Sequence, residues 1–218
     1  MFTLAFDTTA NFCSVALFED LKKIECFEQE MDFGQAEKLM VEIDNMLKKH
    51  NMVFKDLSLV VVCTGPGSFT GVRSSVSAAR AFKLACKDVC VAGVNAFDAY
   101  VADVTPDESA QINAVIIETK REDFYVAYYD NCFNKLMPPT TAFYDDIIKF
   151  LSSKNVTLIG DGVERFLNKP SGLSLHAIKM KQKIDIEKLA LVGIKKYAQK
   201  TTDFPKPLYL KAPDVCIK

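Results

Sequence analysis

The sequence has few histidines, no CxxC pair and no long apolar run, and each of these scarcities excludes a class of protein. No uninterrupted apolar stretch approaches the roughly 18 residues that a membrane-spanning helix requires, so no membrane association is expected. The seven cysteines are odd in number and unpaired in spacing, which argues against a disulfide framework or a zinc site. His50 and His176 stand far apart, so no histidine pair on one helix face is available to a catalytic metal. We therefore expect no metal.

The bulk composition is that of a globular protein with a core. The chain has 218 residues, of which 49% are hydrophobic and 25% charged, enough for one large domain or two lobes. The first twelve residues carry no basic residue ahead of their short apolar stretch, so a secretory signal is not expected. Thiols without partners fit a reducing compartment, and a cytoplasmic location is the expectation.

Charge is unevenly distributed, although the net charge is only −1. Residues 1–60 are acidic, whereas residues 170–218 are rich in lysine. A basic end can contact nucleic acid or an acidic partner, but a solvated lysine surface explains it equally well. The sequence does not predict an RNA-binding protein acting alone.

Short β-rich runs alternate with helical segments in the same order in both halves. Strands are predicted at 2–8, 12–19, 23–30, 57–63 and 88–94, and again at 112–118, 124–130, 133–140 and 156–161. Asp7 follows the first strand of one half, and Glu118 stands in the corresponding place in the other. The pattern predicts an α/β fold built from a duplicated βββαβα unit with mixed sheets and helices.

A glycine-rich stretch, TGPGSFTGVR at 64–73, joins a buried strand to a helix and raises the question of a phosphate-binding loop. It lacks the lysine of a GxxxxGK[ST] loop and departs from GxGxxG at Thr70. Backbone N–H groups with the hydroxyls of Ser68 and Thr70 offer a generic anion site. The structural alternative, that a hydroxyl caps the helix and the glycines allow a sharp turn, is preferred on spacing.

Two helices, at 32–50 and about 70–87, carry an apolar face that we predict to bind a partner. The first has an amphipathic stripe, and the second has a side of small residues that allows close helix packing. Together they offer half of an intermolecular four-helix bundle. The predicted contact residues are Ala36, Leu39, Met40, Ile43, Leu47, Val72, Ser75, Val76, Ala78, Ala79 and Phe82.

The segments DTTANFCSVAL and GPGSFTGVR together resemble the TsaB (YeaZ) family, and the resemblance extends over nearly the whole chain. ETKREDFYVAYY, LIGDG and PLYLKAP resemble later motifs of the family, with Glu118 replacing an aspartate. At the start of the first helix the family often has His-x-Glu, whereas this chain has Gln35-Ala36-Glu37, which puts any histidine role there in doubt.

The resemblance implies a two-lobed actin-like, Hsp70-like and sugar-kinase-like fold. We expect a first lobe at 1–98 completed by a helix at about 185–199, a smaller second lobe at 99–184, and an extended tail at 200–218. The resemblance also implies a non-catalytic subunit in tRNA threonylcarbamoyladenosine synthesis. Its partners would be the catalytic relative TsaD and the ATPase TsaE. The chain would reach tRNA through the complex and form a homodimer when alone.

An enzymatic alternative uses the same fold as a small ATP-dependent phosphotransferase. Asp7 on the first strand would help to hold metal and phosphates, assisted by hydroxyls in the next turn and by the 67–70 turn, and the adenosine would need a pocket in the second lobe. For the non-catalytic subunit no cofactor is expected, and the sequence leaves open whether ATP or ADP binds at a subunit interface. The residues of this hypothetical nucleotide or anion site are Asp7, Thr8, Thr9, Gly67, Ser68 and Thr70. The simpler interpretation is that Asp7 caps its own turn. A peptidase with Ser68 as nucleophile has no histidine context in its favour.

Overall fold

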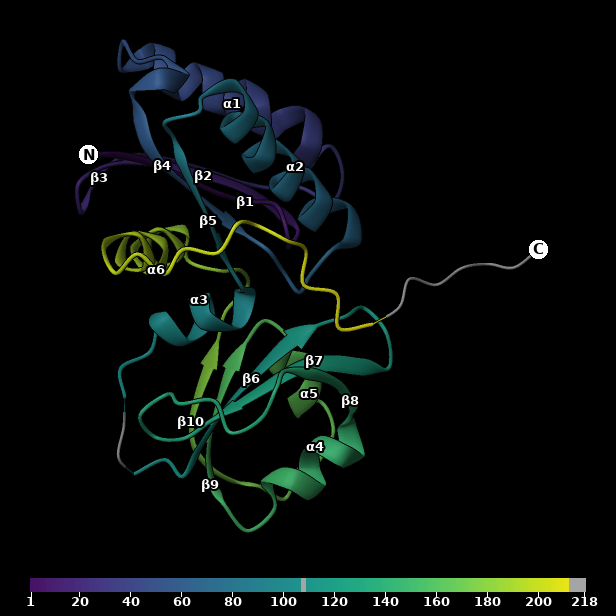
Figure 1. Cartoon of the computed structure of the whole chain (residues 1–218). Coiled ribbons are helices and arrows are strands. Elements are labelled where there is room, and N and C mark those ends of the chain that lie inside the picture. Colours follow the sequence, from purple (N-terminus) through teal and green to yellow (C-terminus); the bar gives the residue numbers. More distant parts are fainter. Residues whose placement is uncertain (107–108, 212–218) are drawn as a thin grey trace. The chain divides into compact units, whose positions relative to one another are not determined.

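A computed structural model describes residues 1–106 and 109–211 (Figure 1). The chain divides into two compact units. Unit 1 comprises Met1–Val104 and Lys183–Pro207, and unit 2 comprises Thr105–Gln182 with the chain from Leu208 onward. The first unit therefore extends past the predicted boundary at 98, and the predicted tail is divided between the units. Residues 212–218 of that tail lie outside the described residues.

Unit 1 contains one five-stranded mixed sheet with strand order β3-β2-β1-β4-β5. β1 pairs antiparallel with β2 and parallel with β4, so the meander and the parallel crossovers meet at β1. The elements of the unit are β1 (Phe2–Asp7), β2 (Phe12–Glu19), β3 (Lys22–Glu30), α1 (Gln35–Lys49), the short 3₁₀ helix η1 (Phe54–Asp56), β4 (Leu57–Cys63), α2 (Phe69–Ala85), β5 (Cys90–Val94), α3 (Ala96–Ala102) and α6 (Ile186–Ala198).

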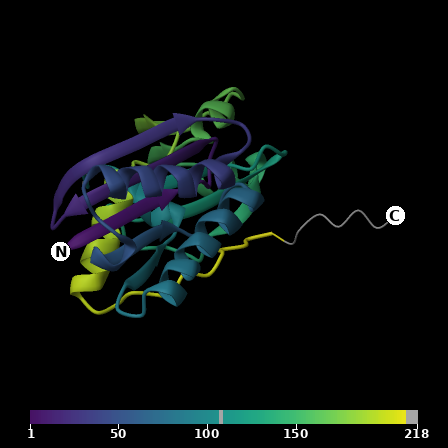
Figure 2. The same cartoon turned by 90° about the horizontal axis from the view of Figure 1, so that it is seen from above.

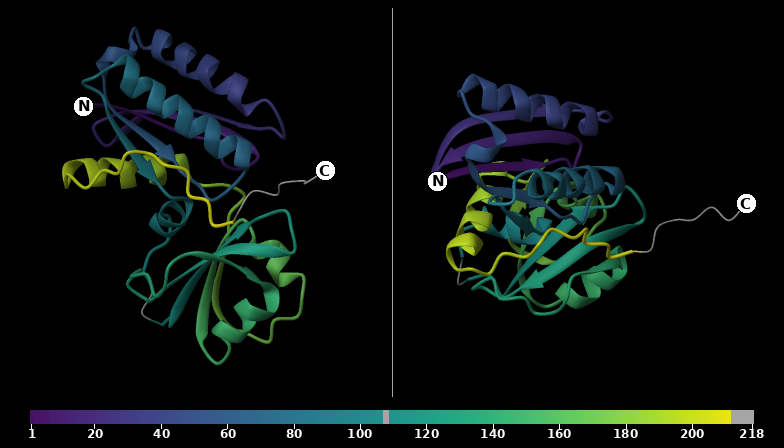
Figure 3. Two further views of the ribbon diagram at one scale, coloured as in Figure 1. Left: turned by 45° about the vertical axis from the view of Figure 1, so that its right-hand side comes forward. Right: turned by 45° about the horizontal axis from the view of Figure 1, so that its top comes forward.

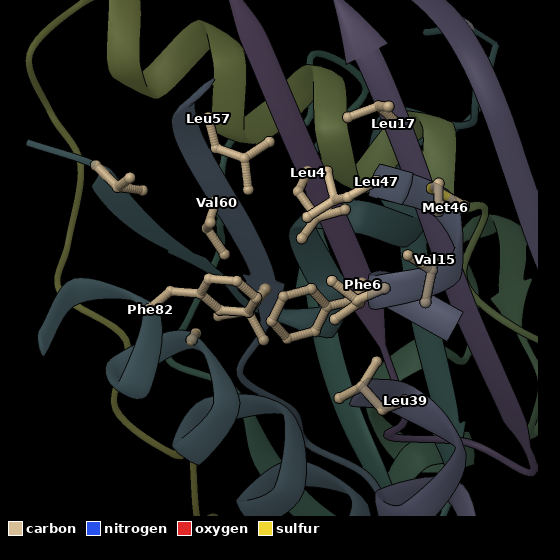
Figure 4. Close-up of a cluster of buried hydrophobic side chains, with 14 of the residues drawn as sticks. Leu4, Phe6, Val15, Leu17, Leu39, Met46, Leu47, Leu57, Val60 and Phe82 are labelled. Atoms are coloured by element: carbon tan, nitrogen blue, oxygen red, sulfur yellow. The ribbon is translucent and has the colours of Figure 1, made fainter. Parts of the chain in front are cut away.

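Helices cover both faces of this sheet. Figure 2 shows α1 and α2 side by side over one face, and Figure 3 shows α6 beneath the other. Alternation along the strands directs Leu4 and Phe6 toward α1 and α2, where they meet Leu39 and Phe82 (Figure 4). On the other face, α6 approaches β4 so closely that a Cβ on Gly193 would lie 3.0 Å from Val61 Cβ.

Unit 2 repeats the arrangement. Its sheet has the order β10-β9-β6-β7-β8, in which β6 takes the place of β1, with β7 antiparallel and β9 parallel to it. Its elements are β6 (Ile112–Glu118), β7 (Asp123–Tyr129), β8 (Thr140–Phe143), α4 (Tyr144–Leu151), β9 (Asn155–Gly160), α5 (Val163–Leu167) and β10 (Ser174–Met180). The predicted duplication and fold class are therefore confirmed.

Three details differ from the sequence prediction. The strand predicted at 133–140 is wrong, because β8 begins at Thr140 and the preceding residues form a turn with one isolated bridge at Lys135. Helix α3 and strand β10 were not predicted.

Among the described residues, no helix combines the length and apolar character that crossing a membrane would require.

Candidate functional site

Asp7 is the last residue of β1, and Thr8 and Thr9 lie in the turn that follows it. All three belong to the hypothetical nucleotide site. Asp7 is only 4% exposed, and its Oδ1 accepts a hydrogen bond from the Thr9 backbone N–H at 2.8 Å. Burial raises the pKa of Asp7 above its ordinary value, while the hydrogen bonds from Thr9 and Cys63 act in the opposite direction. The carboxylate therefore caps its own turn, in the arrangement that the simpler interpretation predicted.

The two hydroxyls nearest this turn satisfy one another. Thr8 Oγ1 donates to Gly71 O at 2.8 Å and lies 2.6 Å from Ser75 Oγ, and the Thr8 backbone N–H donates to Ser75 Oγ at 3.1 Å. Thr9 Oγ1 donates to Cys63 Sγ at 3.6 Å. These bonds join the end of β1 to the first turns of α2 and to the end of β4. The polar groups thus hold three elements together in the interior of unit 1.

The glycines of the 64–73 stretch allow the β1 turn to lie directly against the start of α2. A Cβ on Gly67 would lie 2.9 Å from Thr9 Cβ, and a Cβ on Gly71 would overlap the Thr8 carbonyl and lie 2.8 Å from its carbon atom. The Ser68 backbone N–H donates to Thr9 O at 2.7 Å, and Ser68 Oγ accepts from Gly71 N at 3.3 Å. Ser68 is therefore the N-cap of α2. The backbone N–H groups of Ser68 and Gly71 both have acceptors within the protein.

Asp7→Asn is expected to stabilise unit 1 at neutral pH and to lose that advantage in acid. Because the folded-state pKa of Asp7 is raised, the stability that its proton confers is complete below the unfolded value of about 3.9 and is lost as pH rises through the folded pKa. Each unit of raised pKa corresponds to about 1.4 kcal/mol. Asparagine keeps an acceptor for the Thr9 N–H. Urea unfolding at about pH 4 and about pH 8 measures the difference.

Asp56→Asn provides the matched control for this experiment. Asp56 is exposed, and its Oδ2 also accepts a backbone N–H, from Val53 at 2.8 Å. Removing the Asp56 carboxylate measures what the loss of a capping charge does to stability when that charge is exposed to solvent. If Asp7→Asn were no more stable than the native chain at about pH 8, the buried carboxylate would not be the destabilising group that its surroundings indicate.

Unit 2 has a corresponding turn after β6, but its chemistry is different. Glu118 binds Arg165 of α5 through two hydrogen bonds, Nε to Oε2 at 2.7 Å and Nη2 to Oε1 at 2.8 Å. The Glu118 backbone N–H donates to Asp161 Oδ1 at 3.0 Å, and Arg165 also donates to Asp123 O. The guanidinium thus fixes the acid that corresponds to Asp7, so the two duplicated turns do not form equivalent sites.

The two histidines, His50 and His176, do not take part in a metal site. In the described part of the chain, no group of three or more His, Cys, Asp or Glu side chains has an arrangement that could hold a metal ion. His50 ends α1, as expected, and its Nε2 lies 2.6 Å from Glu25 Oε2. His176 is exposed on β10, with its Nε2 2.9 Å from Ser109 Oγ.

The predicted partner-binding stripe on α1 and α2 needs correction. Most of its members are buried against the sheet of unit 1, because apolar residues at helical spacing here mark the side that faces the chain's own core. Ala36 and Met40 are exposed and Ala78 is half-buried, so these three stay predicted contacts. The other predicted contact residues are buried, so their assignment to the partner surface is wrong: Leu39, Ile43, Leu47, Val72, Ser75, Val76, Ala79 and Phe82.

Gln35, which stands where the TsaB family often has histidine, has a structural bond. Its Nε2 donates to Met31 O at 2.7 Å and so closes the turn that leads into α1. Gly34, in the left-handed conformation, precedes it without a side-chain cap. An amide donor at this position serves the start of the helix.

A family model described as "TsaD: tRNA N6-adenosine threonylcarbamoyltransferase" matches residues 34–218. A Buchnera aphidicola (subsp. Baizongia pistaciae) protein named tRNA threonylcarbamoyladenosine biosynthesis protein TsaB is 24% identical over 169 residues, 75% of this chain and 76% of that protein. The chain belongs to this family as a TsaB-type member.

Solved structures agree with the fold of this TsaB-type chain. YeaZ from Pseudomonas aeruginosa matches with a TM-score of 0.79 at 18% identity, covering 96% of this chain and 99% of that one. A Bacteroides thetaiotaomicron protein described as having an actin-like ATPase fold matches with a TM-score of 0.51 at 9% identity, covering 88% and 95% of the two chains. The actin-like fold predicted from the resemblance is confirmed.

Two residues that bond to the duplicated turns of this TsaB-type chain, Ser75 of α2 and Arg165 of α5, were not predicted in that role. Ser75 was assigned to the partner surface, although a hydroxyl between Val72 and Ala79 on a core-facing side signals a buried hydrogen bond. Arg165 was not considered. Its position in α5, just after the glycine turn of the second half, was the available signal.

Proposed function

We propose that this chain is a non-catalytic subunit in tRNA threonylcarbamoyladenosine biosynthesis. It binds a TsaD-like catalytic relative through the outward surfaces of α1 and α2, works with a TsaE-like ATPase, and reaches tRNA through the complex. The names of its relatives support the pathway. In the absence of the partner, the same surfaces pair two copies of the chain.

Exposed apolar side chains on the outward side of the helix pair carry the proposal. Phe33, just before α1, is 88% exposed, and Leu84 in the last turn of α2 is 84% exposed. Met40 and Val41 of α1 are also exposed. Met40, Val41 and Leu84 lie away from the core-facing sides of their helices, and the two helices pack side by side (Figure 2). Large exposed apolar groups therefore occur along both helices, and such groups favour a protein-binding surface.

The hydrogen bonding after β1 favours this proposal over the phosphotransferase alternative. That alternative requires Asp7 to be ionised and available to a metal, with hydroxyls directed at phosphate. Instead, the pKa of Asp7 is raised by burial and its Oδ1 accepts the Thr9 N–H. Thr8 and Ser75 bond to each other. A polar network that joins elements of one unit suits a supporting subunit.

Leu84→Asp is expected to abolish the mixed complex without changing the melting temperature. A carboxylate placed in an apolar contact loses its hydration without gaining a partner, which costs an interface at least 10-fold in affinity. Size-exclusion chromatography with light scattering, on the chain alone and mixed with the TsaD-like protein of the same organism, measures complex formation. The native chain is expected to shift from a homodimer to a mixed complex.

Leu21→Asp is the matched control, since Leu21 is 67% exposed in the turn between β2 and β3. This variant is expected to form the complex normally. A native chain that ignores the TsaD-like protein would refute the proposed function. Equal loss of binding by both variants would remove the helix pair as the contact surface.

A further inference from the structure

The chain after α6 is fastened to unit 1 over several residues. The Gly93 backbone N–H of β5 donates to Asp203 O at 2.9 Å. Arg80 of α2 donates to Pro205 O through both Nε and Nη2, at 3.0 and 2.9 Å. Residues 203–205 are thus held by one strand and one helix of the same unit, and their backbone position is well defined.

Residues 203–205 pack tightly against β5. Pro205 is buried, and a Cβ on Gly93 would lie 3.1 Å from Pro205 Cα and 2.9 Å from Thr64 Cγ2. Only a hydrogen atom fits at position 93. The sequence therefore provides space for the segment at the outer strand of the sheet, which is also where an uncovered edge would otherwise be open.

Phe204, between these two fastened residues, faces outward. Its side chain is 50% exposed, and its ring centroid lies 5.5 Å from the Arg80 guanidinium carbon. The backbone is fixed on both sides, yet half of the ring stays in water, so the fold of unit 1 gains little from the aromatic group. Phenylalanine and arginine are both among the residue types enriched at protein–protein interfaces.

This position adjoins the apolar end of α2. Arg80 and Leu84 are one helical turn apart and lie on the same side of the helix, so Phe204 and Leu84 are both neighbours of Arg80. We call Arg80, Leu84, Phe204 and Lys206 the α2–tail patch. Helix α2 contains no acidic residue, and Lys206 adds an exposed positive charge to the patch.

We propose that the α2–tail patch is a second contact for the TsaD-like partner, and that it receives an apolar segment flanked by acidic side chains. The inference rests on the proposed function. Two observations select this occupant: the patch continues the α2 surface through Leu84, and its charge is positive, which favours an acidic counterpart and disfavours a basic one. Residues 203–206, which follow α6 in unit 1, are then part of the binding surface.

Phe204→Ala is expected to weaken the mixed complex about 10-fold while leaving the melting temperature of the chain unchanged. Lys206→Glu is expected to weaken it several-fold, and raising the salt concentration is expected to weaken the native complex but to affect Lys206→Glu less. Titration calorimetry with the full-length native chain, the variants and the TsaD-like protein measures these affinities. Phe143→Ala is the control, because Phe143 of β8 in unit 2 is 56% exposed.

The outcomes separate this inference from the proposed function. Native binding that Leu84→Asp abolishes and Phe204→Ala leaves intact would overturn the inference and keep the proposed function. Absence of native binding would overturn both. Loss of homodimer alone on Phe204→Ala would assign the patch to a second copy of the chain. An affinity that is independent of salt and of Lys206→Glu would overturn the acidic character of the partner.

Discussion

Ile43→Glu is expected to leave unit 1 unfolded, and any loss of partner binding by this variant would be a consequence of unfolding. Ile43 has no exposed surface and lies among the residues that α1 packs onto the sheet. Removing a buried isoleucine side chain costs about 2–5 kcal/mol, and enclosing an unpaired carboxylate adds several kcal/mol. Together these terms rival the roughly 5–15 kcal/mol that stabilise a typical domain.

Met40→Glu separates the two sides of the same helix. Met40 is 42% exposed and belongs to the outward surface of α1, so its variant is expected to fold and to bind the partner less well. Circular dichroism and thermal unfolding of Ile43→Glu, Met40→Glu and the native chain provide the test. A folded Ile43→Glu variant with a native melting temperature would contradict the assignment of this side of α1 to the core.

The helix at 32–50 shows what the sequence could and could not predict. Apolar residues at offsets of three and four establish the helix and its apolar side, and the structure has α1 at Gln35–Lys49. The same spacing results whether that side faces its own sheet or another chain. Only the position of the sheet decides between them, and Leu39 is buried at 1% exposure. The surface residues, Phe33 and Leu84, have no periodic signature at all.

The duplicated sheets were predictable because alternation and glycine turns are local signals. Strand β10 was not, since its residues are mostly exposed and its alternation is weak in the sequence. Its pairing partner is β9, across a connection that contains α5. Helix α3 spans only Ala96–Ala102 and follows the strand expected at 88–94 almost directly, so it is too short to show a clear helical period in the sequence. Long-range pairing and short elements were therefore the two sources of error.

The candidate site was predictable in its residues but not in its bonds. The sequence singled out Thr8 and the glycine-rich stretch, and these do meet in the structure. Thr8 and Gly71 are 63 residues apart in the sequence, and no local pattern specifies such a pair. The glycines at 67 and 71 are explained by the Thr8–Thr9 backbone that lies against them.

Gly71→Ala is the sharpest test of this explanation and is expected to destabilise unit 1 by about 3 kcal/mol or more. In an open helix this change would stabilise the protein by up to about 1 kcal/mol, because alanine is the better helix former. Here the added Cβ would overlap the Thr8 carbonyl and lie 2.8 Å from its carbon atom. No rotamer relieves a clash between a Cβ and backbone, so α2 or the β1 turn has to move. Chemical denaturation measures the loss.

Gly172→Ala is the control, because no heavy atom lies within 4 Å of a Cβ built there, and its φ of +58° limits the cost to backbone strain of about 1–2 kcal/mol. Movement of α2 away from the β1 turn would break the Thr8–Ser75 bonds, so Gly71→Ala and Ser75→Ala should be less than additive. A stabilised Gly71→Ala variant would mean that the β1 turn does not lie against α2, and the glycine-rich stretch would again be available as a binding loop.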